Sequence, residues 1–159
     1  MDDLRFNPTQ VRAMRMLSRR SYSARELEKK LVEKGEAAED ARQTVEWLEG
    51  LGYINDAEYA EMVARHYQSK GYGHARIKDE MHRRGIARDY WGDALGILEK
   101  TKIEDAALGF LEKKLRGGND ENDLRRALDA LVRRGFSYEE AKSAVNRYLE
   151  AMLCQTISE

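Results

Sequence analysis

The chain has 159 residues, and 36% of them are charged, with 28 lysines and arginines against 29 aspartates and glutamates. No stretch approaches the roughly 20 apolar residues of a membrane-spanning helix, and the acidic start at Asp2 and Asp3 lacks the apolar centre of a secretory signal. The single cysteine, Cys154, excludes a disulfide scaffold and a cysteine-based zinc site. We therefore expect a cytoplasmic protein that has no membrane segment and holds neither a cofactor nor a metal.

The composition favours an all-α fold. Valine, isoleucine and threonine together make up only about a tenth of the chain, whereas alanine, leucine and the long charged residues that favour helices are abundant. The one proline, Pro8, follows Asn7, which can cap a helix, and precedes Gln10, which can close a capping box. The remaining sequence contains no proline that would break a helix.

Periodicity and start signals predict nine helices in chain order. Capping-box spacing marks three later starts, at Ser23 with Glu26, Asn55 with Glu58, and Ser137 with Glu140. The predicted helices span residues 8–19, 23–34, 38–50, 56–69, 74–84, 88–99, 102–116, 121–134 and 138–151.

An internal repeat of fifty residues organises these helices. Gly35, Gly85 and Gly135 are fifty residues apart, and each fits the left-handed position that ends a helix. The apolar positions around them also recur; they are Leu27/Ile77/Ala127, Leu31/Met81/Leu131, Ala41/Trp91/Ala141, Thr44/Ala94/Ala144, Val45/Leu95/Val145 and Leu48/Leu98/Tyr148. We predict three tandem three-helix repeats, at residues 1–52, 53–100 and 101–159, arranged as an elongated and curved molecule.

Charge alternates along the chain although the formal net charge is only −1. Residues 12–34 and 65–88 each carry +5, and residues 113–134 carry +3, whereas residues 36–61 carry −7 and residues 89–112 carry −4. The simplest explanation is that the cations complement helix dipoles and keep the surface solvated. A basic stripe that recurs along a scaffold also predicts contact with a long acidic partner surface.

Catalytic and metal sites are not predicted. The three histidines, His66, His74 and His82, are eight residues apart, which is not the i, i+4 spacing that places two metal ligands on one helix face. The glycine-rich segment 71–73 lacks the pattern of a phosphate-binding loop. We expect Cys154 to be a structural or buried thiol in a frayed segment, and we expect no enzymatic activity.

The chain resembles the RecX regulatory family. The resemblance is carried by Gly52-Tyr53-Ile54-Asn55-Asp56, by Gly71-Tyr72-Gly73 with Arg76-Ile77, and by Gly85-Ile86, with further matches in the first repeat and the least specific ones in the last. It implies an all-helical protein of tandem three-helix repeats that binds the RecA recombinase filament in its helical groove. It also implies that the protein restrains the recombinase, ATPase and LexA-coprotease activities without chemistry of its own.

Candidate partner contacts lie on the basic middle helices of the first two repeats, with one tyrosine as an aromatic anchor. They are Arg25, Lys29, Lys30, Tyr72, Arg76, Lys78, Arg83, Arg84 and Arg88. A purely solvated role is an equal alternative for each of them, and Tyr72 could instead pack within its own repeat.

Single-stranded DNA is a second candidate partner, because two helices joined by a glycine turn resemble a helix-turn-helix. The helix in the recognition position at residues 36–49 carries five acidic residues and one arginine, and the helix at residues 86–99 carries three acidic residues and one arginine. Both would repel phosphates, which argues against sequence-specific reading. Non-specific contact through the basic helices remains open.

Overall fold

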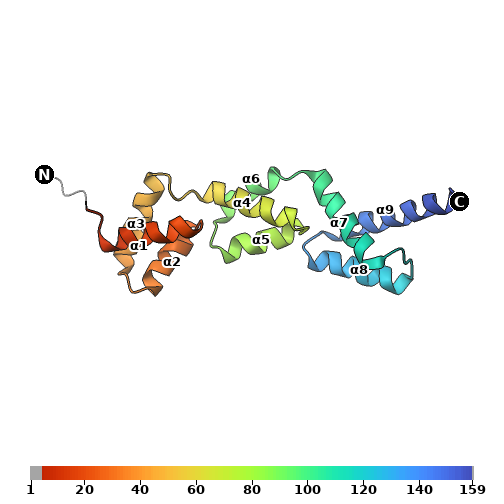
Figure 1. Ribbon diagram of the computed structural model, residues 1–159, viewed down its shortest axis with the longest axis horizontal. Helices are drawn as coiled ribbons and strands as arrows, with labels where there is room; N and C mark the ends of the chain where they lie inside the picture. The colour runs from red at the N-terminus through yellow and green to blue at the C-terminus, as the bar shows by residue number, and fades with distance from the viewer. Residues whose placement is uncertain (1–4, 159) are drawn as a thin grey trace. The chain divides into compact units, whose positions relative to one another are not determined.

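The computed structural model describes residues 5–158, which form nine α-helices and one short 3-10 turn and contain no strand (Figure 1). The helices are α1 (Pro8–Arg19), α2 (Ala24–Glu33), α3 (Ala38–Gly50), α4 (Asp56–Ser69), α5 (His74–Arg83), α6 (Trp91–Gly96), α7 (Lys100–Leu115), α8 (Glu121–Arg133) and α9 (Tyr138–Ile157). The all-α prediction and its nine helices are confirmed within this part of the chain.

The predicted capping residues begin their helices. At α1 the side chains of Asn7 and Gln10 each accept a hydrogen bond from the other residue's backbone N–H, and Pro8 occupies the first helical position. Ser137 and Glu140 form the same reciprocal box at α9. These side chains satisfy N–H groups that have no partner inside the helix, so the sequence fixes where the helices begin.

The three repeat glycines end their helices in the left-handed conformation that the sequence predicts. Gly35, Gly85 and Gly135 have φ angles of +99°, +70° and +99°. In each repeat the next residue donates its N–H to a carbonyl five residues back, as from Ile86 to Met81 at 3.0 Å and from Phe136 to Leu131 at 3.2 Å. This is the glycine-based helix end that leaves few carbonyls unpaired.

The chain divides into two compact units, residues 5–62 with 81–93 and residues 63–80 with 94–158. In the first unit, α1, α2 and α3 enclose a core, as do α7, α8 and α9 in the second. The helices of the middle repeat, α4 to α6, contribute residues to both units.

The recurring apolar positions are core positions. Leu27, Leu31, Ala41 and Leu48 are fully buried in the first unit, and Ala127, Leu131 and Ala141 are fully buried in the second. Their shared burial explains the repeat, because each three-helix module needs apolar residues at the same helical spacing to close its core.

Two helices differ by more than two residues from their predicted extent, and four others differ by one or two residues at an end. The predicted helix 88–99 is a 3-10 turn at Arg88–Tyr90 followed by the short α6, which contains Gly92 and ends at Gly96. Glycine lowers helix propensity by about 1 kcal/mol at each position, which accounts for the shortened helix. The last helix continues to Ile157 instead of ending at residue 151.

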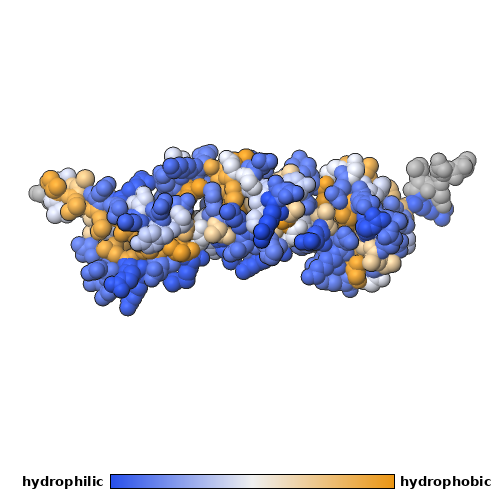
Figure 2. All heavy atoms as spheres, turned by 180° about the vertical axis from the view of Figure 1, so that it is seen from behind, coloured by the Kyte–Doolittle hydropathy of each residue, from blue (hydrophilic) through white to orange (hydrophobic). Residues whose placement is uncertain are grey.

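The extended α9 corrects the prediction for Cys154, which lies in ordered helix and is exposed rather than buried. Exposed apolar side chains, Leu153 and Ile157, also lie on this final stretch, and Figure 2 shows hydrophobic atoms gathered at this end of the chain. No helix among residues 5–158 has the length and apolar character needed to cross a membrane.

Candidate partner-binding site

The start of α2 contacts the end of α5 inside the first unit, and we call this contact the first junction. Ser23 is fully buried, and its hydroxyl donates a hydrogen bond to the carbonyl oxygen of Arg84. The same oxygen of Ser23 accepts the backbone N–H of Glu26 at 3.1 Å, which caps α2. One buried hydroxyl therefore both begins a helix and links two repeats.

The equivalent positions, fifty residues further on, form a second junction inside the second unit. Here the backbone N–H of Gly73 donates to the carbonyl oxygen of Arg134 at 3.0 Å, and the N–H of Ala75 donates to that of Gly135 at 3.1 Å. A Cβ atom on Gly73 would lie 2.4 Å from the backbone of Gly135. The two backbones therefore meet at a distance that only glycine allows.

The arginines before Gly85 and Gly135 each turn inward to a junction. Arg84 donates from Nη1 to the hydroxyl of Tyr59 at 2.9 Å. Arg134 donates to the carbonyl oxygens of Lys70 at 3.2 Å and Gly71 at 3.4 Å, just past the end of α4. A guanidinium suits this place because its planar donors complement the negative end of a helix.

Tyr72, the predicted aromatic anchor, is half-buried and packs within the second unit. Its ring centre lies 5.7 Å from that of Tyr67 and 4.4 Å from the guanidinium carbon of Arg134. Arg76 lies 5.6 Å from the same ring and pairs with the buried Glu80 at 3.3 Å. Tyr72, Arg76 and Arg84 thus make contacts within the chain, and Tyr72 packs against Tyr67 of its own repeat and Arg134 of the next.

The other candidate residues are exposed. Arg25, Lys29 and Lys30 lie on α2, with Lys30 close to Glu33 at 3.3 Å. Lys78 and Arg83 lie on α5. Arg88 lies in the 3-10 turn, where its guanidinium carbon is 5.7 Å from the ring centre of Trp91.

The structure therefore divides the candidate set into two classes. Cations of the first class lie exposed on α2, on α5 and in the 3-10 turn, although Lys30 on α2 also pairs with Glu33, and those of the second class contact other residues at the junctions. Arg134 and Tyr59, which complete the junctions, are not among the contacts predicted from the sequence. The fifty-residue offset from Arg84 to Arg134 is the signal that could have identified the first of them.

The pKa values of two carboxylates in the first unit, Asp56 and Glu39, are shifted for different reasons. The Asp56 carboxylate accepts the backbone N–H of Ala24 at 2.9 Å, at the start of α2. Burial raises the pKa of Asp56 above its usual value, and this hydrogen bond partly opposes the increase. On the exposed side of α3, Arg42 bonds to both Glu39 and Glu46 and lowers the pKa of Glu39.

No group of three histidine, cysteine, aspartate or glutamate side chains in residues 5–158 is arranged to hold a metal ion. The arrangement can instead provide exposed positive charge and half-buried aromatic rings, which are features of binding surfaces.

Comparison with known proteins identifies the family. Models of the first and second three-helix domains of RecX match residues 11–48 and 55–95. A regulatory protein RecX from Xanthomonas campestris is 34% identical over 87% of this chain and 86% of its own length, and one from Trichlorobacter lovleyi is 35% identical over 78% and 84%.

Solved structures agree on the fold. The crystal structure of RecX from Lactobacillus salivarius superposes with a TM-score of 0.81 at 22% identity, covering 88% of this chain and 94% of that one. A second crystal structure of regulatory protein RecX gives a TM-score of 0.78 at 20% identity, over 87% and 70%. The resemblance seen in the sequence is confirmed: the chain belongs to the RecX family of regulatory proteins.

Proposed function

We propose that this protein binds the RecA recombinase filament in its helical groove and modulates, mainly by inhibition, the recombinase, ATPase and coprotease activities. The protein acts in the cytoplasm as a binding partner and catalyses no reaction itself. Membership of a regulatory family over most of the chain supports this function.

The observation that carries the proposal is the exposure of cations on the middle helices of two successive repeats. Arg25 and Lys29 on α2 and Lys78 on α5 point to solvent, and none of the three forms a hydrogen bond or ion pair with the rest of residues 5–158. A filament repeats its surface at every subunit, so two basic helices on one chain can contact neighbouring subunits. The first contact raises the effective concentration of the second, so weak contacts together give firm binding.

Non-specific binding of single-stranded DNA is the second candidate function. The same exposed cations favour it, because phosphate neutralisation drives such binding. The charge of α3 opposes it, since Arg42, the one arginine of that helix, is bonded to Glu39 and Glu46. The acidic face next to α2 would therefore repel a nucleic acid backbone.

The test adds the purified protein to recombinase assembled on single-stranded DNA. We expect ATP hydrolysis and LexA cleavage to fall as the protein is added. A salt titration of fluorescent single-stranded DNA, without recombinase, separates the two functions. Tight DNA binding at physiological salt with no effect on the recombinase would contradict the proposal and favour the DNA-binding function.

A further inference from the structure

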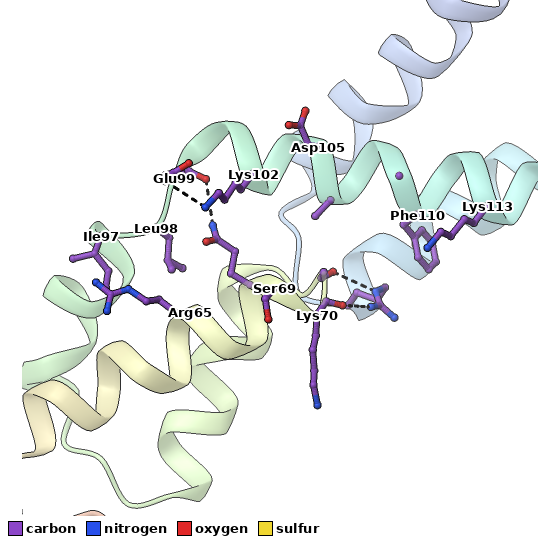
Figure 3. Close-up of a pocket in the computed structure, with 15 residues that line it drawn as sticks. Arg65, Ser69, Lys70, Ile97, Leu98, Glu99, Lys102, Asp105, Phe110 and Lys113 are labelled. Atoms are coloured by element: carbon purple, nitrogen blue, oxygen red, sulfur yellow. Dashed lines mark hydrogen bonds and ion pairs between the residues drawn. The ribbon is translucent and has the colours of Figure 1, made fainter. Parts of the chain in front are cut away.

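A groove of about 720 Å³ lies within the second unit, between the end of α4 and one face of α7. Figure 3 shows Ile97 and Leu98 at one end of this groove and Phe110 and Lys113 at the other. None of the nine candidate contacts from the sequence lines it, so it is a separate surface of the molecule.

Helix α7 has two faces with different roles. Ile103, Ala107 and Leu111 are buried in the core of the third repeat. An adjoining face lines the groove with Ala106 and Gly109, spaced three residues apart between Lys102 and Lys113, and Ala106 also packs against the core. A Cβ atom on Gly109 would meet no heavy atom within 4 Å, so the floor of the groove is open there.

The groove lining is positively charged. Five cationic side chains and two acidic ones line it, which gives a formal charge of +3. One acidic group, Glu99, is already paired with Lys102 at 3.4 Å. Lys113, at the other end, is exposed and forms no hydrogen bond or ion pair with the rest of residues 5–158.

We propose that this groove binds an acidic protein segment that has small apolar residues at its centre and carboxylates at its ends. Lys102 and Lys113 are eleven residues apart, which is about 16 Å along a helix. About five residues of an extended peptide span that distance. The carboxylates then lie near the two ends of the groove, and the apolar centre lies over Ala106 and Gly109. The proposal rests on the proposed function in one respect, because it assigns the segment to the regulated recombinase.

A protein segment fits the groove better than a nucleic acid does. Phe110 is the aromatic residue of the lining, and cations already approach its ring, with Arg134 at 5.1 Å and Lys114 at 5.8 Å. The ring is therefore not open for base stacking, on which single-strand binding depends. The apolar Ile97 and Leu98 suit peptide side chains rather than a sugar–phosphate backbone.

Blocking the open floor tests the proposal without disturbing the core. Gly109→Leu adds a side chain where the structure leaves space, in a helix that glycine weakens. Gly92→Leu is the matched control, since Gly92 is exposed in α6 and its Cβ would also meet nothing within 4 Å. Circular dichroism of both variants establishes that they remain folded.

The binding assay uses a fluorescein-labelled ten-residue peptide in which two glutamates stand five residues apart with alanines between them. We expect the wild type and Gly92→Leu to bind it, and Gly109→Leu to bind at least tenfold more weakly. Lys113→Glu should weaken binding as well, whereas its neighbour outside the groove, Lys114→Glu, should not. Failure of the wild type to bind the peptide, or equal binding by Gly109→Leu, overturns the proposal.

Further experiments distinguish the acidic segment from other occupants of the groove, and they distinguish failure of the groove proposal from failure of the proposed function. If the wild type binds a thymidine oligonucleotide but not the peptide, and Gly109→Leu no longer binds the oligonucleotide, the groove is a nucleic acid site and the proposal is wrong. Self-association abolished by Gly109→Leu would assign the groove to a second copy and also overturn it. If Gly109→Leu still inhibits the recombinase fully, the groove proposal fails and the proposed function stands. If the wild type does not inhibit while the peptide results hold, the proposed function fails and the groove remains a peptide site.

Discussion

The two repeat junctions occupy equivalent positions but use different chemistry. In the first, the Ser23 hydroxyl bridges to the carbonyl oxygen of Arg84. In the second, Gly73 replaces the serine, and two backbone hydrogen bonds connect the repeats directly. A Cβ on Gly85 would lie 3.2 Å from Ser23 Oγ, whereas one on Gly135 would lie 2.4 Å from the Arg76 nitrogen. A glycine at the position of Ser23 thus goes with a closer approach of the two backbones at the second junction.

The tyrosines before these two positions show the same divergence. Tyr22 is covered by Arg20 of its own repeat, with the guanidinium carbon 3.7 Å from the ring centre. Tyr72 is covered by Arg134 of the next repeat. The arginine equivalent to Arg134 is Arg84, which contacts Tyr59 instead. Each tyrosine therefore has a cation over its ring, but the nearest one comes from its own repeat at Tyr22 and from the next repeat at Tyr72.

The largest expected effect on stability is the difference between replacing Gly135, which lies in the tight second junction, and replacing Gly35, which has open space around it. Gly135→Ala should lower the free energy of unfolding by about 2 kcal/mol more than Gly35→Ala, because only the first introduces a backbone clash. Both glycines have a φ of +99°, so both variants carry the same left-handed strain of about 1–2 kcal/mol. Urea unfolding followed by circular dichroism measures the difference, and equal losses would show that the close approach is unimportant.

Arg134→Ala tests the inward arginine of the second junction. We expect a loss of about 2 kcal/mol, since the change removes hydrogen bonds to two carbonyls and the contact with Tyr72. The exposed neighbour is the control, and Arg133→Ala should change stability by about 0.5 kcal/mol or less. Faster amide exchange at Gly73 and Ala75 in Arg134→Ala would locate the loss at the junction. Unchanged exchange and stability would contradict this role.

Ser23→Ala tests the hydroxyl of the first junction against an ordinary helix cap. The variant loses both the cap of α2 and the bond to Arg84, whereas Ser137→Ala loses a cap alone. We expect about 1 kcal/mol for the cap and about 1 kcal/mol more for the buried bond. Thermal unfolding of the two variants gives the comparison. If Ser137→Ala proves as costly, the bond between repeats contributes nothing measurable.

The smallest expected effect concerns Asp56, at the edge of the first junction. Asp56→Asn keeps an oxygen for the Ala24 N–H and removes a charge that burial disfavours, so stability near neutral pH should rise by about 0.5 kcal/mol or less. Because folding raises the pKa of Asp56, the ionised wild type bears this penalty above that pKa. The advantage should disappear as the pH falls below the ordinary pKa of an aspartate. Urea unfolding at several pH values checks this sign, and an advantage that grows at low pH would refute it.

Much of the fold could be predicted from the sequence because the signals are local. Capping boxes and repeat glycines fix helix ends through hydrogen bonds between residues a few positions apart, and apolar spacing defines the core faces. Periodicity failed where glycines weaken a helix, as at Gly92 and Gly96, and at the chain end, where α9 continues past residue 151.

The binding surface was less predictable because the charge of a residue does not reveal whether its side chain points to solvent or into the molecule. Arg83 and Arg84 are neighbours in the sequence, yet Arg83 is exposed and Arg84 turns to Tyr59. The groove beside α7 joins residues from 65 to 134 and has no sequence signature, since its floor depends on packing distant in the chain. The elongated and curved arrangement of the repeats stays a prediction.

The most direct test of the central claim is inhibition of recombinase ATP hydrolysis by a variant of the exposed cations. Arg25→Glu, Lys29→Glu and Lys78→Glu are combined, and a matched control reverses three exposed cations of the third repeat, Arg125, Arg126 and Lys142. We predict that the first variant needs at least tenfold more protein for half-inhibition, with an unchanged melting temperature, and that the control inhibits like the wild type. Equal inhibition by the wild type and the folded α2 and α5 variant would contradict the account.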